Sequence, residues 1–300
     1  MRAQKEVNEG KKINDVKEHE GNIAAFFDLD GTLQALPTLE KRFFRMLRYR
    51  KEIPARNCFL WLLEALRLLP QGINAVLQAN KMFLRGVPVL DESGERDGDV
   101  CSWHKSDHQA TVQASALPSK RARRNPRLTG PAFFAPAVER VAWHAKRGHE
   151  MVLVSGTLEP LAWEAARAME DELAARGITT KIHVCATRLE EFDHRWTGRV
   201  LGEAMFGKAK ARAVKRLAGE MQLDLERCYA YGDSLNDRWL MAAVGRPAAV
   251  NPSKDLLSVA RTCAWPVLHW ERKKNHSPCD KELRVQQECR MELARPENPE

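Results

Sequence analysis

Short apolar runs that alternate with helix-patterned segments constrain the fold of this 300-residue chain more than any other feature. The runs predict buried strands at 22–28, 150–155, 180–186, 227–231 and 248–251. Apolar residues at helical spacing predict helices between the strands, at 133–147, 158–176, 206–221 and 235–244. Strands joined by helices of this length form right-handed crossovers in a mostly parallel sheet. We therefore predict an α/β fold with helices flanking the sheet.

The first predicted strand ends at a pair of carboxylates. Asp28 stands at the strand tip and Asp30 follows two residues later, just before Gly31 and Thr32. A carboxylate at the tip can act as a nucleophile or a metal ligand, and the second can give and take a proton. A plain Asp-Gly turn is the alternative. The apolar strand that leads into the pair favours the chemical role.

Ser155 and Gly156 follow the second predicted strand, immediately before a helix. Backbone N–H groups at the start of a helix are free to bind an anion. A serine in this position is also a common helix cap, so this segment alone is a weak signal. It gains weight because the carboxyl ends of parallel strands meet at one edge of a sheet.

Further polar residues follow the strand predicted at 227–231. Asp233 comes first, and Asn236 and Asp237 lie one turn later. Carboxylate and amide oxygens at this spacing suit Mg²⁺. Lys208 opens the helix predicted at 206–221, where its charge opposes the helix dipole unless an anion lies nearby. Lys208 is therefore our candidate for neutralising a phosphate, and a solvated surface lysine is the alternative.

Taken in chain order, these segments resemble the four motifs of the haloacid dehalogenase superfamily of phosphohydrolases. FFDLDGTL resembles the first motif, VSGT the second, the lysine of GKAKARAV the third and YGDSLND the fourth. The long interval between the first two accommodates an inserted helical cap, as in the phosphoserine-phosphatase-like branch (subclass IB). The resemblance implies a Rossmann-like catalytic core over 21–37 and 129–270, and a helical cap domain over 38–128.

The resemblance also implies a Mg²⁺-dependent phosphatase that hydrolyses a phosphomonoester through an aspartyl-phosphate. Asp28 would attack the phosphorus, and Asp30 would protonate the leaving alcohol and then activate water. The phosphate-binding residues would be Gly31, Thr32, Ser155, Gly156 and Lys208. The metal would be held by Asp28, the main-chain carbonyl of Asp30 and Asp233, with Asn236 and Asp237 in support.

The resemblance leaves the substrate open. Phosphoserine phosphatases carry a glutamate nine residues after the nucleophile, which engages the substrate's amino group. Pro37 occupies that position here, and Glu40 comes three residues later. We therefore expect a small or lipid-like phosphate ester, with phosphoserine as the alternative. A non-catalytic protein that binds anions or membranes is an alternative of a different class, but such a protein has no need of Asp30.

Segment 38–90 is apolar and basic, and it predicts two or three helices with breaks near Ile53 and Pro54 and at 69–72. These helices can pack on one another and on the core, or make a peripheral contact with a membrane. The net charge of +8 suits an anionic partner. Spread-out aromatic residues offer no stacking platform, so no nucleic acid partner is expected.

The remaining stretches are polar. We predict tails at 1–20 and 271–300, and a disordered insertion at 91–128. Within that insertion, Cys101, His104 and His108 are interpreted as a chance cluster, and 120–124 as a solvated basic run. Seven scattered cysteines, a polar start and the lack of a long apolar run predict a cytoplasmic protein without a transmembrane segment.

Overall fold

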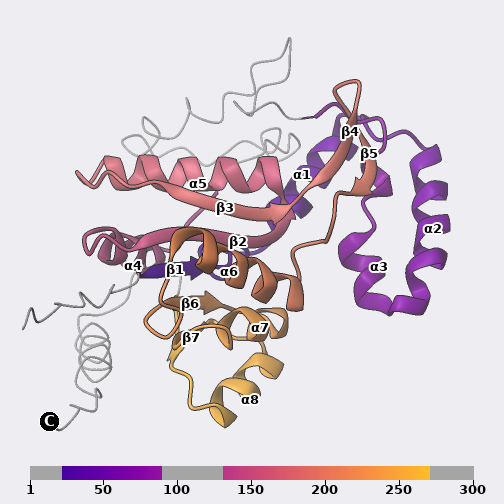
Figure 1. Cartoon of the computed structure of the whole chain (residues 1–300). Helices are drawn as coiled ribbons and strands as arrows, with labels where there is room; N and C mark the ends of the chain where they lie inside the picture. Colours follow the sequence, from indigo (N-terminus) through magenta and orange to yellow (C-terminus); the bar gives the residue numbers. More distant parts are fainter. Residues whose placement is uncertain (1–21, 90–130, 271–300) are drawn as a thin grey trace, which may run out of the picture.

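A six-stranded parallel sheet forms the centre of the computed structural model, which describes residues 22–89 and 131–270 (Figure 1). The strand order is β3-β2-β1-β6-β7-β8. The strands are β1 (Ala24–Phe27), β2 (Glu150–Leu158), β3 (Ile182–Thr187), β6 (Tyr229–Gly232), β7 (Arg246–Val250) and β8 (Val267–Leu268). From β1 the strands run outward to β3, and the chain then returns to β6 on the other side of β1. The sheet therefore has a switch point between β1 and β6, where α/β proteins commonly bind ligands.

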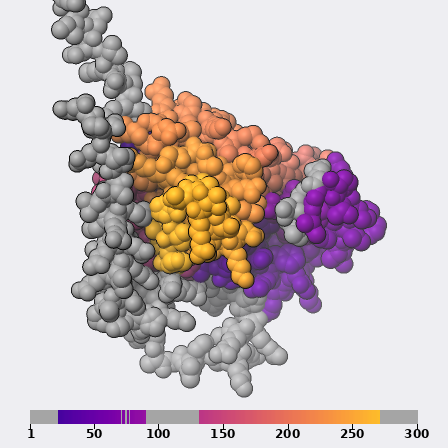
Figure 2. All heavy atoms as spheres, turned by 90° about the horizontal axis from the view of Figure 1, so that it is seen from below, coloured from indigo at the N-terminus to yellow at the C-terminus, as the bar shows by residue number. Residues whose placement is uncertain are grey.

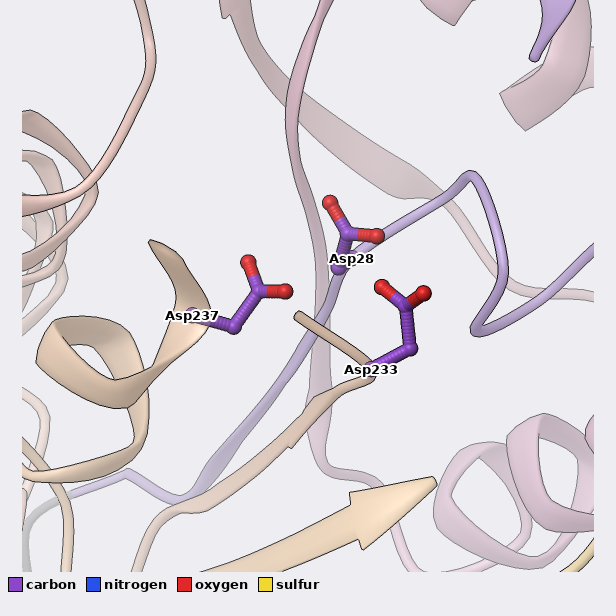
Figure 3. A group of neighbouring side chains, drawn as sticks. All are labelled: Asp28, Asp233 and Asp237. Atoms are coloured by element: carbon purple, nitrogen blue, oxygen red, sulfur yellow. The ribbon is translucent and has the colours of Figure 1, made fainter. Parts of the chain in front are cut away.

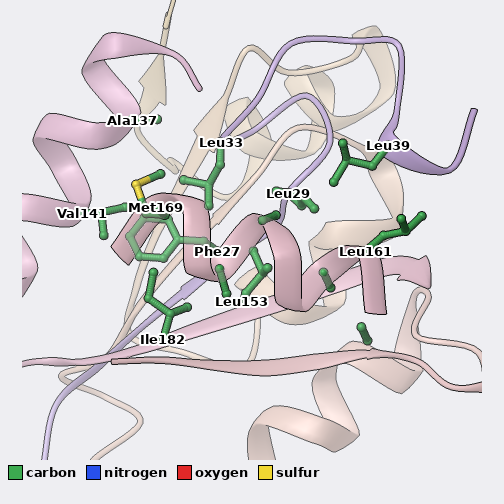
Figure 4. Packing of buried hydrophobic residues seen from close by; sticks show 14 of the residues in the cluster. Phe27, Leu29, Leu33, Leu39, Ala137, Val141, Leu153, Leu161, Met169 and Ile182 are labelled. Atoms are coloured by element: carbon green, nitrogen blue, oxygen red, sulfur yellow. The ribbon is translucent and has the colours of Figure 1, made fainter. Parts of the chain in front are cut away.

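Helices cover both faces of this sheet. One face carries α4 (Ala135–Ala145) and α5 (Glu159–Ala174), and the other carries α6 (Lys208–Met221), α7 (Arg238–Met241) and α8 (Lys254–Thr262). Phe27 packs with buried residues of α4 and α5 (Figure 4), whereas Phe26 packs with those of α6 to α8. Successive side chains of a strand point to opposite faces of the sheet. Because helices cover both faces, the side chains on both sides of β1 are apolar.

The predicted strands and helices are confirmed, with shifted ends. The strand predicted at 150–155 continues to Leu158, because the Ser-Gly-Thr segment stays extended and Leu158 pairs with Thr187 of β3. The helix predicted at 235–244 is a 3-10 turn, η4 (Leu235–Asp237), followed by the short α7. The sequence did not predict α8, β8 or the antiparallel hairpin of β4 (Leu189–Phe192) and β5 (Arg195–Val200).

Residues 38–89, which we call the cap segment, form three helices between β1 and α4. They are α1 (Leu39–Tyr49), α2 (Arg56–Leu68) and α3 (Ile73–Ala79), with the 3-10 turns η1 (Leu69–Gln71) and η2 (Met82–Leu84). The helix breaks fall near Pro54 and at 69–72, as predicted. In Figure 1, α2 and α3 lie at the right-hand edge, apart from the layers that flank the sheet.

The β4–β5 hairpin attaches the end of the cap segment to the core. The N–H of Gly86 donates to the carbonyl of Trp196 at 2.8 Å, and the N–H of Trp196 donates to the carbonyl of Val87 at 3.0 Å. The buried Trp196 ring also meets Phe43 of α1 edge-on, with ring centroids 5.9 Å apart. Backbone pairing and aromatic packing together fix this end of the cap segment against the hairpin.

Across the two described ranges, none of the helices combines the length and the apolar character that crossing a membrane requires. Several sequence predictions lie outside the described residues. They are the tails at 1–20 and 271–300 and the insertion at 91–128, with Cys101, His104, His108 and the basic run at 120–124.

His144 of α4 is fully buried beside β6. Its Nε2 lies 2.9 Å from the hydroxyl of Tyr231, and its Nδ1 lies 2.8 Å from Nδ1 of His149. Burial first, and then the nearby His149, Arg140 and Arg147, lowers the pKa of His144 to about 2. As the pH falls below about 6.5, the His144 ring binds a proton in the unfolded chain but stays neutral in the folded protein. The contribution of the neutral His144 ring to the free energy of unfolding is therefore fully present above that pH and is lost progressively as the pH falls below it.

We expect acidification from about pH 7 to about pH 5 to lower the free energy of unfolding by about 2 kcal/mol through this group. His144→Gln keeps a hydrogen-bonding side chain that does not titrate, so its free energy of unfolding will fall less over the same range. Urea unfolding at both pH values, followed by fluorescence, measures the two drops. Equal drops in the two proteins would contradict the buried neutral ring.

Candidate active site

Three carboxylates converge at the carboxyl edge of the sheet, at the switch point between β1 and β6. Asp28 follows β1, Asp233 follows β6 and Asp237 ends η4. The N–H of Asp28 donates to the carbonyl of Tyr231 at 2.9 Å, which continues the β1–β6 pairing to the edge. One carboxylate oxygen from each aspartate lies within 4.8 Å of the other two (Figure 3). Residues far apart in sequence thus form one acidic cluster.

A buried lysine holds two of these carboxylates together. Nζ of Lys210 donates to Oδ1 of Asp28 at 2.5 Å and to Oδ1 of Asp237 at 2.6 Å. Burial opposes the charge of Lys210, but the two carboxylates raise its pKa above the ordinary value. The ammonium group therefore stays charged, and it is hydrogen-bonded to the candidate nucleophile.

This arrangement corrects the prediction of Lys208, which lies outside the cluster. Lys208 is exposed at the start of α6, with its Nζ 5.1 Å from the centroid of the Trp239 ring. Lys210 lies on the buried face of α6, one turn before Ala213 and Val214. Spacing from these apolar residues would have selected Lys210, because residues three and four apart share a helix face. The helix dipole points to the first lysine of α6 and does not indicate which face of the helix is buried.

Asp237 is fixed by its own turn. Its Oδ2 accepts hydrogen bonds from the N–H of Ser234 at 3.0 Å and from the hydroxyl of Ser234 at 2.7 Å. A Cβ at Gly232 would overlap the Asp237 side chain, so glycine is needed at the end of β6. With Lys210 on its other oxygen, Asp237 has both carboxylate oxygens occupied. Asn236 lies beside it and lines the cavity described below.

Asp30 connects the site to the cap segment. Its Oδ1 accepts a hydrogen bond from the N–H of Leu39 at 3.0 Å and from Nε2 of Gln34 at 2.6 Å. Burial raises the pKa of Asp30 above its ordinary value, although these two hydrogen bonds lower it. Leu39 is the first residue of α1, so the second carboxylate of the Asp-x-Asp pair also positions the first cap helix.

The other predicted phosphate-binding residues divide into two groups. Ser155 and Gly156 line the cavity, whereas Gly31 and Thr32 do not. Gly31 has a φ of +99°, and a Cβ there would overlap Asp233, so its role is to let the loop close against that carboxylate. Thr32 is fully buried.

Thr157 lines the cavity and was not among the site residues predicted from the sequence. Its N–H donates to Oγ of Ser155 at 3.2 Å, and its side chain lines the cavity. The hydroxyl of Thr157 is buried, and it has no hydrogen-bond partner among the described residues. A buried hydroxyl without a protein partner is available to donate a hydrogen bond to a ligand. The position of Thr157 directly after Ser155 and Gly156 in the sequence could have identified it as a site residue.

A cavity of about 1040 Å³ lies between the acidic cluster and the cap segment. The cap segment lines it with both apolar and basic side chains. The apolar ones are Phe44, Ile53, Trp61 and Phe83, and the basic ones are Lys41, Arg48, Lys51 and Lys81. Glu40, the acidic cap residue in the lining, forms an ion pair with the buried Lys81. The cap side of the cavity is therefore positively charged and faces a negatively charged core.

The acidic cluster fits a divalent cation. Burial first, and then Asp28 and Asp237, raises the pKa of Asp233 to about 9. Burial also raises the pKa of Asp28 to about 7, against the opposing effect of Lys210. Two of the three carboxylates are buried and the third is half-buried, and one ammonium group does not fully stabilise their ionised forms; a divalent cation would. Their donor atoms are all oxygens, the ligands that Mg²⁺ prefers.

Residues 25–242 match the family model of the haloacid dehalogenase-like hydrolases. A "Probable phosphatase" of Mycobacterium tuberculosis is 37% identical over 145 residues, which cover 48% of this chain and 47% of the relative. A phosphoserine phosphatase of the same organism is 36% identical over 124 residues, which cover 41% of this chain and 37% of the relative. The chain thus spans about half or less of the length of these curated relatives.

Solved structures share the fold. A protein with unknown function from Bordetella pertussis Tohama I superposes with a TM-score of 0.54 at 24% identity, covering 83% of this chain and 98% of that one. A cytosolic 5'-nucleotidase IIIB bound to cytidine superposes with a TM-score of 0.51 at 12% identity, covering 91% of this chain and 87% of that one. The family match includes Asp28, Lys210, Asp233 and Asp237. The chain belongs to the haloacid dehalogenase-like hydrolase family.

Proposed function

We propose that this protein is a Mg²⁺-dependent phosphatase that hydrolyses a phosphomonoester through an aspartyl-phosphate on Asp28. The position of Asp28 carries the proposal. Its carboxylate lines the cavity, is hydrogen-bonded to Lys210 and has Asp30 in the same lining. Family membership and the relatives named as phosphatases support this reaction class.

In the first step, a carboxylate oxygen of Asp28 forms a bond to phosphorus while the bond to the ester oxygen breaks. Asp30 gives its proton to that oxygen, so the alcohol leaves neutral. In the second step, water attacks phosphorus and Asp30 takes its proton. Inorganic phosphate leaves and the Asp28 carboxylate is restored. The raised pKa of Asp30 supports its role as the proton donor.

The surrounding groups hold the phosphate and offset its charge. Ser155, Gly156 and Thr157 line the cavity and would hold the phosphate, and Lys210 supplies a positive charge beside Asp28. Asp28 and Asp233 would hold the metal directly with the main-chain carbonyl of Asp30. Both carboxylate oxygens of Asp237 already accept hydrogen bonds from Lys210 and Ser234, so Asp237 would support the metal site without binding the ion directly. When bound, Mg²⁺ reduces the repulsion between a carboxylate and a phosphate dianion.

The substrate that best fits the cavity is a small or lipid-like phosphate ester without an ammonium group. Phosphoserine carries an ammonium group that needs a free carboxylate. Glu40 is paired with Lys81, and the other charged cap residues in the lining are cations. Apolar side chains of the cap segment suit an apolar leaving group. A purely anion-binding protein would not need Asp30 in the cavity.

The reaction is tested with p-nitrophenyl phosphate. We expect hydrolysis with Mg²⁺ and none after EDTA treatment, with recovery when Mg²⁺ is restored. Asp28→Asn keeps the shape of the side chain but removes the nucleophilic charge, so the rate should fall by at least about a thousandfold. Turnover that survives either the removal of metal or the Asp28→Asn change would contradict the mechanism.

The two lysines of α6 provide a matched pair. Lys210→Met removes the cation beside Asp28 and should lower kcat by at least about a hundredfold. Lys208→Met changes an exposed residue of the same helix and should leave kcat within about twofold. Circular dichroism of both variants controls for folding. Comparable losses in the two variants would refute the assignment of Lys210.

Phosphoserine and its analogue without the amino group separate the two substrate classes. The cap side of the cavity is positive, so we expect kcat/KM for the analogue to exceed that for phosphoserine by at least about tenfold. Steady-state phosphate release from each compound measures the ratio. A panel of sugar phosphates and lysophospholipid phosphates then ranks the leaving groups. Preference for phosphoserine would show that Glu40 remains available to an ammonium group.

A further inference from the structure

An exposed apolar surface runs along α2 to the start of α3. Phe59, Leu62, Leu63 and Leu66 follow helical spacing, so they share one face, and Leu69 and Ile73 continue it. These six side chains, which we call the α2 apolar face, are between 48% and 67% exposed. They make up six of the eleven large hydrophobic side chains that are exposed in the described residues.

The orientation of α2 explains this exposure. Asn57 is its buried residue, and Nδ2 of Asn57 donates to the carbonyls of Phe83 at 3.0 Å and Arg85 at 2.7 Å. Cys58 and Trp61 line the cavity. A polar side chain thus attaches the helix to the η2 turn and the residue after it, while the leucines of α2 face away, the reverse of an ordinary surface helix. Figures 1 and 2 both show this part of the cap segment protruding from the molecule.

The cap segment is strongly basic, and two of its exposed arginines, Arg56 and Arg67, lie on α2 itself. Residues 38–89 contain ten Lys and Arg and three Asp and Glu, so they carry +7 of the chain's net +8. Arg56 is exposed one turn before Phe59, and Arg67 is exposed four residues after Leu63. Exposed basic side chains therefore lie at the start of the α2 apolar face and beside Leu66, where Arg67 also pairs with Glu64 at 3.4 Å. Apolar side chains flanked by cations are complementary to an anionic lipid surface.

We propose that the α2 apolar face docks on the surface of an anionic lipid bilayer. Its side chains would enter the boundary between headgroups and acyl chains, and the basic residues of the cap segment would contact the anionic headgroups. Cys58 and Trp61 lie on the adjacent side of the same helix, so docking brings the cavity close to the lipid surface. The docking residues are separate from the catalytic ones, so the inference goes beyond the proposed reaction.

Vesicle co-sedimentation tests the proposal with the full chain. One set of vesicles contains phosphatidylcholine alone, and the other contains phosphatidylcholine mixed with phosphatidylglycerol. We expect the protein to sediment with the mixed vesicles and to remain in solution with the neutral ones. High salt should weaken the binding, because it screens the attraction between the cap segment and the headgroups.

A double variant, Leu62→Ser/Leu66→Ser, removes the centre of the face. We expect its partitioning to the mixed vesicles to fall by at least about tenfold. Leu201→Ser is the matched control, since Leu201 is 45% exposed in the turn after β5 and lies outside the cap segment. That variant should bind as the unmodified protein does. Circular dichroism confirms that both variants are folded.

Three results would overturn the proposal. They are no binding to the mixed vesicles, equal binding to both kinds of vesicle, and unchanged binding of the double variant. A dimer in sedimentation velocity that the double variant dissociates would instead assign the face to a second copy of the chain. Asp28→Asn should bind vesicles like the unmodified protein, so a failure of docking and a failure of the proposed reaction are separate results.

Discussion

The buried ammonium group of Lys210 is the interaction on which the rest of the site depends. It lies between Asp28 and Asp237, which the chain brings from the end of β1 and from η4. Without a cation between them, buried carboxylates at this separation would repel one another or become protonated. The sheet order places their backbones together; Gly232 leaves room for Asp237, and Gly31 leaves room for the neighbouring Asp233.

Charge is divided between the two sides of the cavity. The core side carries the acidic cluster, and the cap side carries cations and apolar side chains. The contacts that hold the sides together include the hydrogen bond from the N–H of Leu39 to Asp30 and the backbone pairing of Gly86 and Val87 with Trp196. A phosphate ester fits this division, since its phosphate needs a cation at the core while its leaving group meets the cap segment.

The convergence of Asp28, Asp233 and Asp237 could be predicted from the sequence, because strand ends meet at one edge of any parallel sheet, whatever the details of packing. It selected Lys208 over Lys210 because the dipole argument ignored which face of α6 packs on the sheet. Helical spacing showed that Leu62 and Leu66 share a face, but spacing cannot reveal whether another element covers that face. The β4–β5 hairpin was missed because only a few of its residues, such as Trp196, are buried.

Trapping the phosphorylated enzyme tests the role of Asp28 most directly. The protein is mixed with a phosphomonoester and Mg²⁺, quenched in acid during turnover and digested for peptide mass spectrometry. A phosphoryl group should appear on the peptide that contains Asp28, and it should be absent from the Asp28→Asn variant. Turnover without a phosphorylated peptide, or with the phosphoryl group on another residue, would contradict nucleophilic attack by Asp28.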